Sequence, residues 1–185
     1  KQAVYDVNIL TVNDEDVTGA ETRPMADVYV DELVTVVAEL NPQDADYEDF
    51  QIRFVTSDGM EIFGYEDWVE VIGAKVSDGK YIADFIFRMI PAEEVFIQAY
   101  VDGMMSGNVL LNVYNRVQSI DVSMQPEYWI GNEAEIFEFK YSVNPDNVKN
   151  ADFAVKSSAP DMAEIIKDQE SGMYQLHAYA PGEVT

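Results

Sequence analysis

The chain has 185 residues and a mass of 20.9 kDa, with 35 acidic and 11 basic residues and a formal net charge of -24. Hydrophobic residues make up 48% and aromatic residues 12%, which is enough apolar surface for a folded core and argues against a disordered polyanion. The acidity argues against nucleic acid and anionic membranes as partners, because both are polyanions.

The chain has no cysteine and one histidine, His177. These counts exclude disulfides, thiolate metal sites, cysteine nucleophiles and multi-histidine metal sites. No sequence pattern gives His177 an activating partner, so we expect no catalytic residue and no enzyme activity. No run of 18 apolar residues is present, so we expect no membrane-spanning segment. Lys1 is not an initiator methionine and no signal peptide is visible, which predicts a processed product or a cloned fragment.

Alternation of apolar and polar residues with a period of two dominates the chain and predicts strands. The expected strands lie, in chain order, at residues 34–40, 50–54, 81–89, 95–101, 109–113, 119–124 and 137–143. Asp102-Gly103 predicts a turn after 95–101, in a hairpin with a longer loop. No segment keeps helical spacing over about 11 residues without a break. We therefore expect an all-β fold with at most short helical turns.

The sequence contains an internal repeat at a shift of about 103 positions. Residues 32–62 align with residues 135–165 without a gap, with eight identities in 31 positions. The identities include Asn41-Pro42 with Asn144-Pro145, and the apolar positions of 34–40 fall on apolar positions of 137–143. The repeat predicts two copies of one β-domain.

The domain boundary is expected near Asn115, which gives domains at 1–115 and 116–185 with almost no linker. The first copy runs 23 residues beyond Pro91 to Tyr114, whereas four residues follow Pro181 in the second. We therefore expect the second domain to be incomplete at its C-terminus and to lack most of its last hairpin. Restoring about 20 downstream residues is expected to raise its melting temperature, because paired sheet edges are more stable than unpaired ones.

The second half resembles the bacterial Ig-like domains, most closely those of group 2. The matching segments are a leading strand at 117–122, Trp129-Ile130-Gly131-Asn132-Glu133, Val143-Asn144-Pro145-Asp146, a strand-like segment at 153–158, and Tyr179-Ala180-Pro181-Gly182-Glu183-Val184-Thr185. The family's usual tryptophan falls here on Ala154 or Val155. The resemblance implies two tandem immunoglobulin-like β-sandwich domains. It also implies a secreted protein or a surface protein of bacteria. Anchoring through lipid would require a segment outside this sequence.

Asp44 and Asp46 are the candidate metal ligands. They stand two residues apart in the acidic loop 41–49, so an extended loop would direct both carboxylates to one side. Calcium prefers such oxygen ligands, although the EF-hand pattern is absent. The alternative is a solvated loop in an acid-rich chain.

Two aromatic pairs are the candidate ligand-binding residues: Tyr65 with Trp68, and Tyr128 with Trp129. An aromatic ring beside carboxylates suits sugar binding, because the ring stacks on C–H groups while the acids bind hydroxyls. The alternative is that both tryptophans cap the cores of their sandwiches. The resemblance implies that Trp129 packs inward, ahead of Gly131.

The leading functional hypothesis is a non-catalytic extracellular protein that serves adhesion, binding or spacing at the bacterial cell surface, with a protein or a carbohydrate as partner. One alternative is a carbohydrate-binding accessory module of a larger polysaccharide-processing protein. Another is a pilus-type subunit that receives a strand from its neighbour. Met104-Met105 in the expected hairpin is either a contact surface or core filling.

Overall fold

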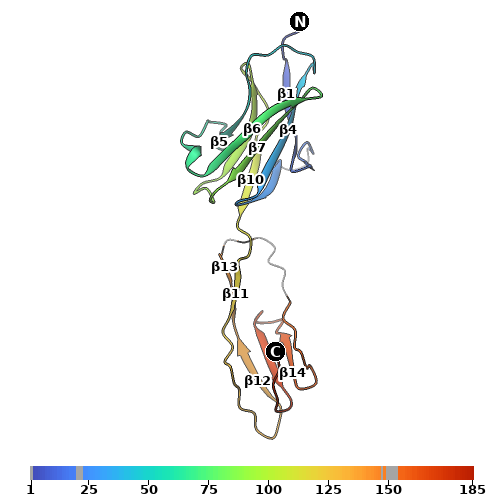
Figure 1. The fold of residues 1–185 in the computed structure, drawn as a ribbon, viewed down its shortest axis with the longest axis vertical. Helices are drawn as coiled ribbons and strands as arrows, with labels where there is room; N and C mark the ends of the chain where they lie inside the picture. The colour runs from blue at the N-terminus through green and yellow to red at the C-terminus, as the bar shows by residue number, and fades with distance from the viewer. Residues whose placement is uncertain (1, 20–22, 147, 149–153) are drawn as a thin grey trace. The chain divides into compact units, whose positions relative to one another are not determined.

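The structure is a computed structural model that describes residues 2–19, 23–146, 148 and 154–185. The chain divides into two compact units, Lys1–Asn115 and Arg116–Thr185 (Figure 1). Regular structure in the described residues consists of strands and one 3-10 turn, η1 (Tyr65–Asp67). This confirms the all-β prediction. Within the described ranges, no helix has the length and apolar character needed to cross a membrane.

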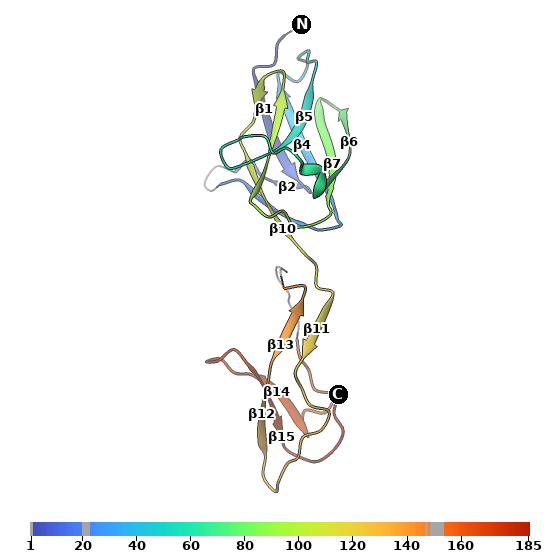
Figure 2. The ribbon, with the colours of Figure 1, turned by 90° about the vertical axis from the view of Figure 1, so that its left-hand side faces the viewer.

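Unit 1 is a sandwich of two sheets (Figures 1 and 2). One sheet has the order β2-β1-β4-β7-β6 and the other β3-β10-β8-β5, with β9 paired to β8. The bounds are β1 (Asp6–Val12), β2 (Glu15–Asp16), β3 (Met25–Tyr29), β4 (Leu33–Asn41), β5 (Phe50–Val55), β6 (Val69–Ser77), β7 (Lys80–Phe87), β8 (Val95–Val101), β9 (Met104–Met105) and β10 (Val109–Tyr114). The neighbours β1-β4-β7-β6 and β10-β8-β5 follow the A-B-E-D and G-F-C orders of immunoglobulin domains. The fold is therefore immunoglobulin-like.

The core of unit 1 comes from the alternation that the sequence predicts. In β4, Val34, Val36 and Ala38 are fully buried, while the residues between them are half-buried. β4 pairs with β7 in a register that sets Val34 beside Phe85. Phe85 lies against Phe54 of the facing sheet, with ring centroids 5.1 Å apart. The aliphatic rows of both sheets thus close around a cluster of aromatic rings.

Tyr81 gives unit 1 an expected dependence on alkaline pH. Its ring stacks on Phe50 with centroids 4.1 Å apart, and burial, with the nearby charge of Asp49, raises the pKa of its phenol. Because the folded state holds this proton more firmly, the stabilisation is present below the ordinary pKa of about 10 and is lost as pH rises through the raised pKa. We expect the urea midpoint of the wild type to fall more steeply between about pH 8 and about pH 11 than that of Tyr81→Phe. Equal slopes would contradict this origin.

Unit 2 repeats the first sheet of unit 1. Its strands are β11 (Ser119–Val122), β12 (Glu135–Phe139), β13 (Tyr141–Asn144), β14 (Ala163–Lys167) and β15 (Tyr174–Ala178). β11 pairs with β13, and the order β12-β15-β14 forms a three-stranded sheet. With β12 and β13 in the place of β4, this order reproduces β1-β4-β7-β6 of unit 1.

The pairing registers of the two units agree strand by strand. Asn41 lies opposite Asp6 and Leu40 opposite Val7 in unit 1, just as Asn144 lies opposite Ser119 and Val143 opposite Ile120 in unit 2. Likewise the Val34–Phe85 pair corresponds to the Phe137–Leu176 pair. The peptide bonds before Pro42 and Pro145 are both cis. Agreement in register is a stronger sign of a repeat than sequence identity, because a slip by one residue would exchange the two faces of a strand.

The inward face of the unit 2 sheet is more exposed than its counterpart. Val7 and Ile9 of unit 1 are 1% and 6% exposed, whereas the equivalent Ile120 and Val122 are 40% and 46% exposed. The described residues of unit 2 form the pairings β11-β13 and β12-β15-β14, and none of these corresponds to the β3-β10-β8-β5 sheet of unit 1. Because Ile120 and Val122 bury less apolar surface than Val7 and Ile9, each of them contributes less to stability than its counterpart.

Two expectations for unit 2 differ from the structure. The strand expected at 137–143 is interrupted at Lys140, whose N–H donates to Ser123 Oγ and whose carbonyl accepts from Ser123 N–H. The strand-like segment expected at 153–158 begins outside the described residues, and residues 154–158 form no strand. Ser158 N–H there donates to the Thr185 carbonyl at 2.8 Å. The repeat aligns Ser158 with Val55, so this contact corresponds to the pairing of Val55 with Phe96 in unit 1.

Candidate functional site

Tyr65 and Trp68 pack into the edge of the unit 1 core. The Trp68 ring stacks on Phe87 and meets Phe54 edge-on, both at 5.6 Å between centroids. The Tyr65 ring lies 5.1 Å from that of Phe54. Both side chains are half-buried and belong to the hydrophobic cluster, which agrees with the core-capping alternative. Sugar binding at Tyr65 and Trp68 stays a prediction.

Tyr128 and Trp129 behave differently from each other. The Tyr128 ring packs on Phe137 at 4.6 Å, and its hydroxyl accepts a hydrogen bond from Gln125 N–H at 2.9 Å. Trp129 is 88% exposed, so the expectation that it packs inward is wrong. The physical reason is that adjacent side chains point to opposite sides of an extended segment, and Tyr128 occupies the apolar side. Sugar binding at Trp129 stays a prediction.

Asp44 and Asp46 are both exposed in the loop between β4 and β5. The loop is held by its backbone: Ala45 N–H donates to the Pro42 carbonyl, and Asp46 N–H to that of Gln2. Among the described residues there is no group of three or more histidine or acidic side chains that could hold a metal ion. Calcium binding here stays a prediction that the structure does not test.

His177 is half-buried in the central strand of its sheet, where its Nε2 lies 3.1 Å from Gln175 Oε1. Its neighbours across the sheet are Ile136 on β12 and Glu164 on β14. Among the described residues, no acidic or nucleophilic side chain is hydrogen-bonded to His177, and its side-chain partner is the amide of Gln175.

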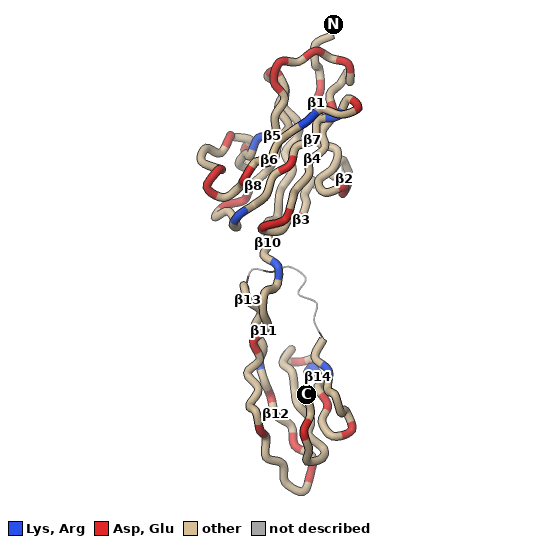
Figure 3. The backbone as a smooth tube through the Cα atoms, viewed as in Figure 1, with Lys and Arg blue, Asp and Glu red and all other residues tan. Residues whose placement is uncertain are grey.

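The outer face of the β3-β10-β8-β5 sheet is the surface that the sequence analysis missed. We call it the outer face and define it by the outward-pointing residues of the four strands. These are Met25, Asp27 and Tyr29 on β3, Leu110, Asn112 and Tyr114 on β10, Phe96, Gln98 and Tyr100 on β8, and Gln51, Arg53 and Val55 on β5. It holds one carboxylate, although Asp and Glu are spread over both units (Figure 3).

The middle of the outer face is packed rather than wet. Val55, Phe96 and Leu110 form a small buried cluster, separate from the main core. The Arg23 guanidinium carbon lies 4.2 Å from the centre of the Phe96 ring. Gln98 donates to Asn108 Oδ1 at 3.0 Å and is 6% exposed. The face is thus a preformed surface, whose side chains would lose little conformational freedom on binding.

One end of the outer face combines aromatic, sulfur and guanidinium groups. The Arg53 guanidinium carbon lies 3.3 Å from the centre of the Tyr100 ring, as in a cation–π stack. Arg53 Nε is buried and has no hydrogen-bond acceptor. Met105 on β9 pairs with Tyr100 and is 58% exposed. We call Gln51, Arg53, Tyr100 and Met105 the Arg53 patch.

The composition of the Arg53 patch is typical of protein interfaces, which are enriched in Tyr, Arg and Met and depleted of Asp and Glu at their centres. The patch offers a guanidinium, an amide, an aromatic ring and a thioether, which are groups that make non-covalent contacts. A sequence signal existed: the outward positions of 95–101 are Phe96, Gln98 and Tyr100, where a solvated strand would carry charges. Met104-Met105 was noticed, but not its place beside Tyr100.

A cavity of about 370 Å³ lies at the edge of the sandwich, lined among others by Asn8 and Leu10 of β1, Glu39 of β4 and Asn108 before β10. Its lining mixes amide, carboxylate and aliphatic groups, without a cluster that selects one ligand class.

No family model matches the chain, and no curated protein matches it. Among solved structures, the chain is similar to the IG1+IG2 segment of DIP-gamma, at 7% identity and a TM-score of 0.37, covering 96% of this chain and 84% of that one. It is also similar to the tandem Ig repeats of Dlar (12% identity, TM-score 0.32, 94% and 82% covered). A third is the adhesin InvE of Yersinia pseudotuberculosis (9% identity, TM-score 0.37, 95% and 51% covered). At such TM-scores the likeness supports no conclusion about function, and the fold rests on strand order and register.

Proposed function

We propose that the chain is a non-catalytic binding protein displayed outside a bacterial cell, whose tandem immunoglobulin-like units serve adhesion to a protein partner. The observation that carries this proposal is the Arg53 patch, in which Met105 is exposed and Gln51, Arg53 and Tyr100 are half-buried, with an interface composition in a chain of net charge -24. The charge suits a solvated extracellular surface, since it keeps molecules apart except where the acids are absent.

The test combines location and adhesion. An antibody against unit 1 should label intact, unpermeabilised cells of the source organism. Excess purified chain should inhibit adhesion of those cells, and Tyr100→Ala should inhibit less, because truncating an aromatic side chain at the centre of an interface removes a large contact. Lys75→Gln, on β6 of the other sheet, is the matched control and should inhibit like the wild type. Labelling only after permeabilisation, or equal inhibition by all three proteins, would contradict the proposal.

A second candidate is carbohydrate binding through Trp129, because its indole is 88% exposed beside the exposed Glu127 and Glu133 in the sequence. A glycan array separates the two functions: a signal that Trp129→Ala abolishes and Tyr100→Ala retains would favour the sugar.

A further inference from the structure

The charge of the side chains around the Arg53 patch changes along β5 and β8 from positive through neutral to negative. β5 pairs with β8 so that Gln51 lies opposite Tyr100 and Arg53 opposite Gln98. Two residues before Gln51, Asp49 N–H donates to Asp102 Oδ1 at 3.0 Å, and Gln51 Nε2 donates to Asp49 Oδ2 at 2.8 Å. The Asp102 carboxylate thus lies against the Asp49 backbone, and the Asp49 carboxylate against Gln51, at the end of the ladder. The outer face therefore has a positive row at Arg53 and a neutral row at Gln51 and Tyr100, and a negative row at Asp49 and Asp102 follows just beyond the ends of β5 and β8.

The positive row has no carboxylate partner in the described part of the chain. Among the residues that the structure describes, no carboxylate pairs with Arg53, and its Nε has no acceptor. Arg88 shows the contrast, because it is bound by both Asp31 and Glu70. In a chain with 35 acidic residues, a stacked guanidinium without a carboxylate offers its donors to a carboxylate from outside.

The negative row, in contrast, would be neutralised by a positive charge from a partner. Asp49 and Asp102 are both exposed, and Asp102 spends its hydrogen-bonding capacity on the N–H groups of Glu48 and Asp49. Those bonds hold the Asp102 carboxylate, whereas the Asp49 carboxylate is held by Gln51 Nε2, which donates to Asp49 Oδ2 at 2.8 Å. These donors are neutral, and Glu48 is a third exposed acid, next to Asp49 in the sequence. A basic side chain from a partner would neutralise this row, and it would also offset the long-range repulsion by a molecule of net charge -24.

The distance between the rows sets the spacing in the partner. Asp49 and Arg53 are four residues apart on one extended segment, which corresponds to about 13 Å at about 3.3 Å per residue. An extended partner segment has the same rise, and residues four apart in it point to the same side. The neutral row between them, Tyr100 with Met105 beside it, fits an apolar side chain midway.

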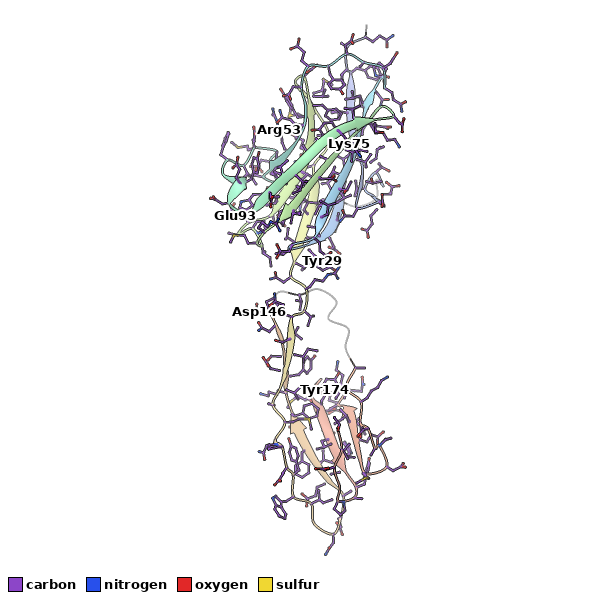
Figure 4. The ribbon with its side chains drawn as sticks, in the orientation of Figure 1. Tyr29, Arg53, Lys75, Glu93, Asp146 and Tyr174 are labelled. Atoms are coloured by element: carbon purple, nitrogen blue, oxygen red, sulfur yellow. The ribbon has the colours of Figure 1, made fainter. Side chains whose placement is uncertain are left out.

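We propose, on the basis of the proposed protein-binding function, that the Arg53 patch binds an extended protein segment in which an acidic and a basic residue stand four positions apart, with an apolar residue between them. The acidic side chain pairs with Arg53. The basic side chain faces Asp49 and Asp102, and the apolar one covers Tyr100 and Met105. Arg53 and the control position Lys75 belong to different sheets of unit 1 (Figure 4).

The test is a selection from a library of random 12-residue peptides displayed on phage, with the immobilised full chain as bait. The enriched peptides should carry Asp or Glu four residues from Lys or Arg. For a synthetic peptide of that pattern, Arg53→Gln should weaken binding about ten- to hundredfold, the range for a charge-assisted hydrogen-bonded pair. Lys75→Gln should leave binding unchanged, and a peptide with the two charges three apart should bind weakly, since its charged side chains point to opposite sides.

Two variants keep the result interpretable. Arg53→Lys preserves the charge but not the planar fork, so it should retain part of the affinity, whereas a merely unfolded patch would retain none. The melting temperature of each variant checks folding. If the selected peptides lack the charge pattern but their binding is abolished by Tyr100→Ala, this inference is overturned and the protein-binding function stands. Peptides indifferent to Tyr100, Arg53 and Asp49 would overturn both, as would selection of peptides that bind unit 2 alone.

Discussion

Phe85→Ala is expected to lower the free energy of unfolding of unit 1 by about 3–5 kcal/mol, the range for truncating a buried phenylalanine. Phe85 is 2% exposed, and its ring lies 5.1 Å from that of Phe54 and 5.8 Å from that of Phe87. Alanine would leave a cavity in the centre of this aromatic cluster, between two sheets whose strands are each fixed by hydrogen bonds to their neighbours in the sheet. Little collapse into the space is therefore expected.

Leu176→Ala is the matched substitution in unit 2, because the pairing with Phe137 puts Leu176 in the place of Phe85. Leu176 is only half-buried, so its removal should cost less than about 2 kcal/mol. Equal losses in the two units would contradict the difference in burial.

The single tryptophan of each unit makes the comparison measurable. Trp68 packs against the unit 1 core, so its fluorescence should shift to the red when unit 1 unfolds. Trp129 is already exposed and should change little, while circular dichroism reports both units. Because the chain has two units, its urea transition is to be fitted as two steps rather than one.

The sequence predicts the strands and the repeat where a one-sided alternation is present. Residues 34–40 and 137–143 show that pattern, and the structure places Val34 and Phe137 at equivalent positions. The ungapped alignment fails further on. It pairs Ile165 with Ile62, whereas the register of β14 puts Ile165 in the place of Val71. Loops between strands can differ in length without destabilising the core. An ungapped alignment that crosses such a loop therefore does not predict the register of the next strand.

The binding surface could be predicted only in part, and for a physical reason. Alternation of apolar and polar residues assigns Phe96, Gln98 and Tyr100 to one side of a strand. It does not predict which other residues cover that side. Arg23 reaches Phe96 from a segment far away in the sequence, and Arg53 reaches Tyr100 across the sheet. The predicted sites had a different weakness. A tryptophan beside an acid is as compatible with a core edge as with a sugar site, and only the structure shows that Trp68 is half-buried against the core while Trp129 is exposed.

Trp68→Ala is expected to destabilise unit 1 by about 3 kcal/mol or more, whereas Trp129→Ala is expected to change stability by less than about 0.5 kcal/mol. Trp68 stacks on Phe87 and meets Phe54 edge-on, so its removal opens the end of the core. The substitution keeps the backbone bond in which Arg88 N–H donates to the Trp68 carbonyl at 2.8 Å, so the loss of stability measures the side chain. Trp68→Phe keeps an aromatic ring in the site and should recover more than half of the loss.

The same two variants separate structure from recognition. A glycan that binds through Trp129 would be lost in the stable Trp129→Ala protein and kept in Trp68→Phe, with unchanged circular dichroism in both. Urea unfolding followed by circular dichroism measures the stability of each variant, and titration with the glycan measures its affinity. A large loss of stability in Trp129→Ala would show that its indole packs against the protein, contrary to its 88% exposure. A stability of Trp68→Ala equal to that of the wild type would show that the aromatic cluster of Phe54, Phe85 and Phe87 holds without its cap.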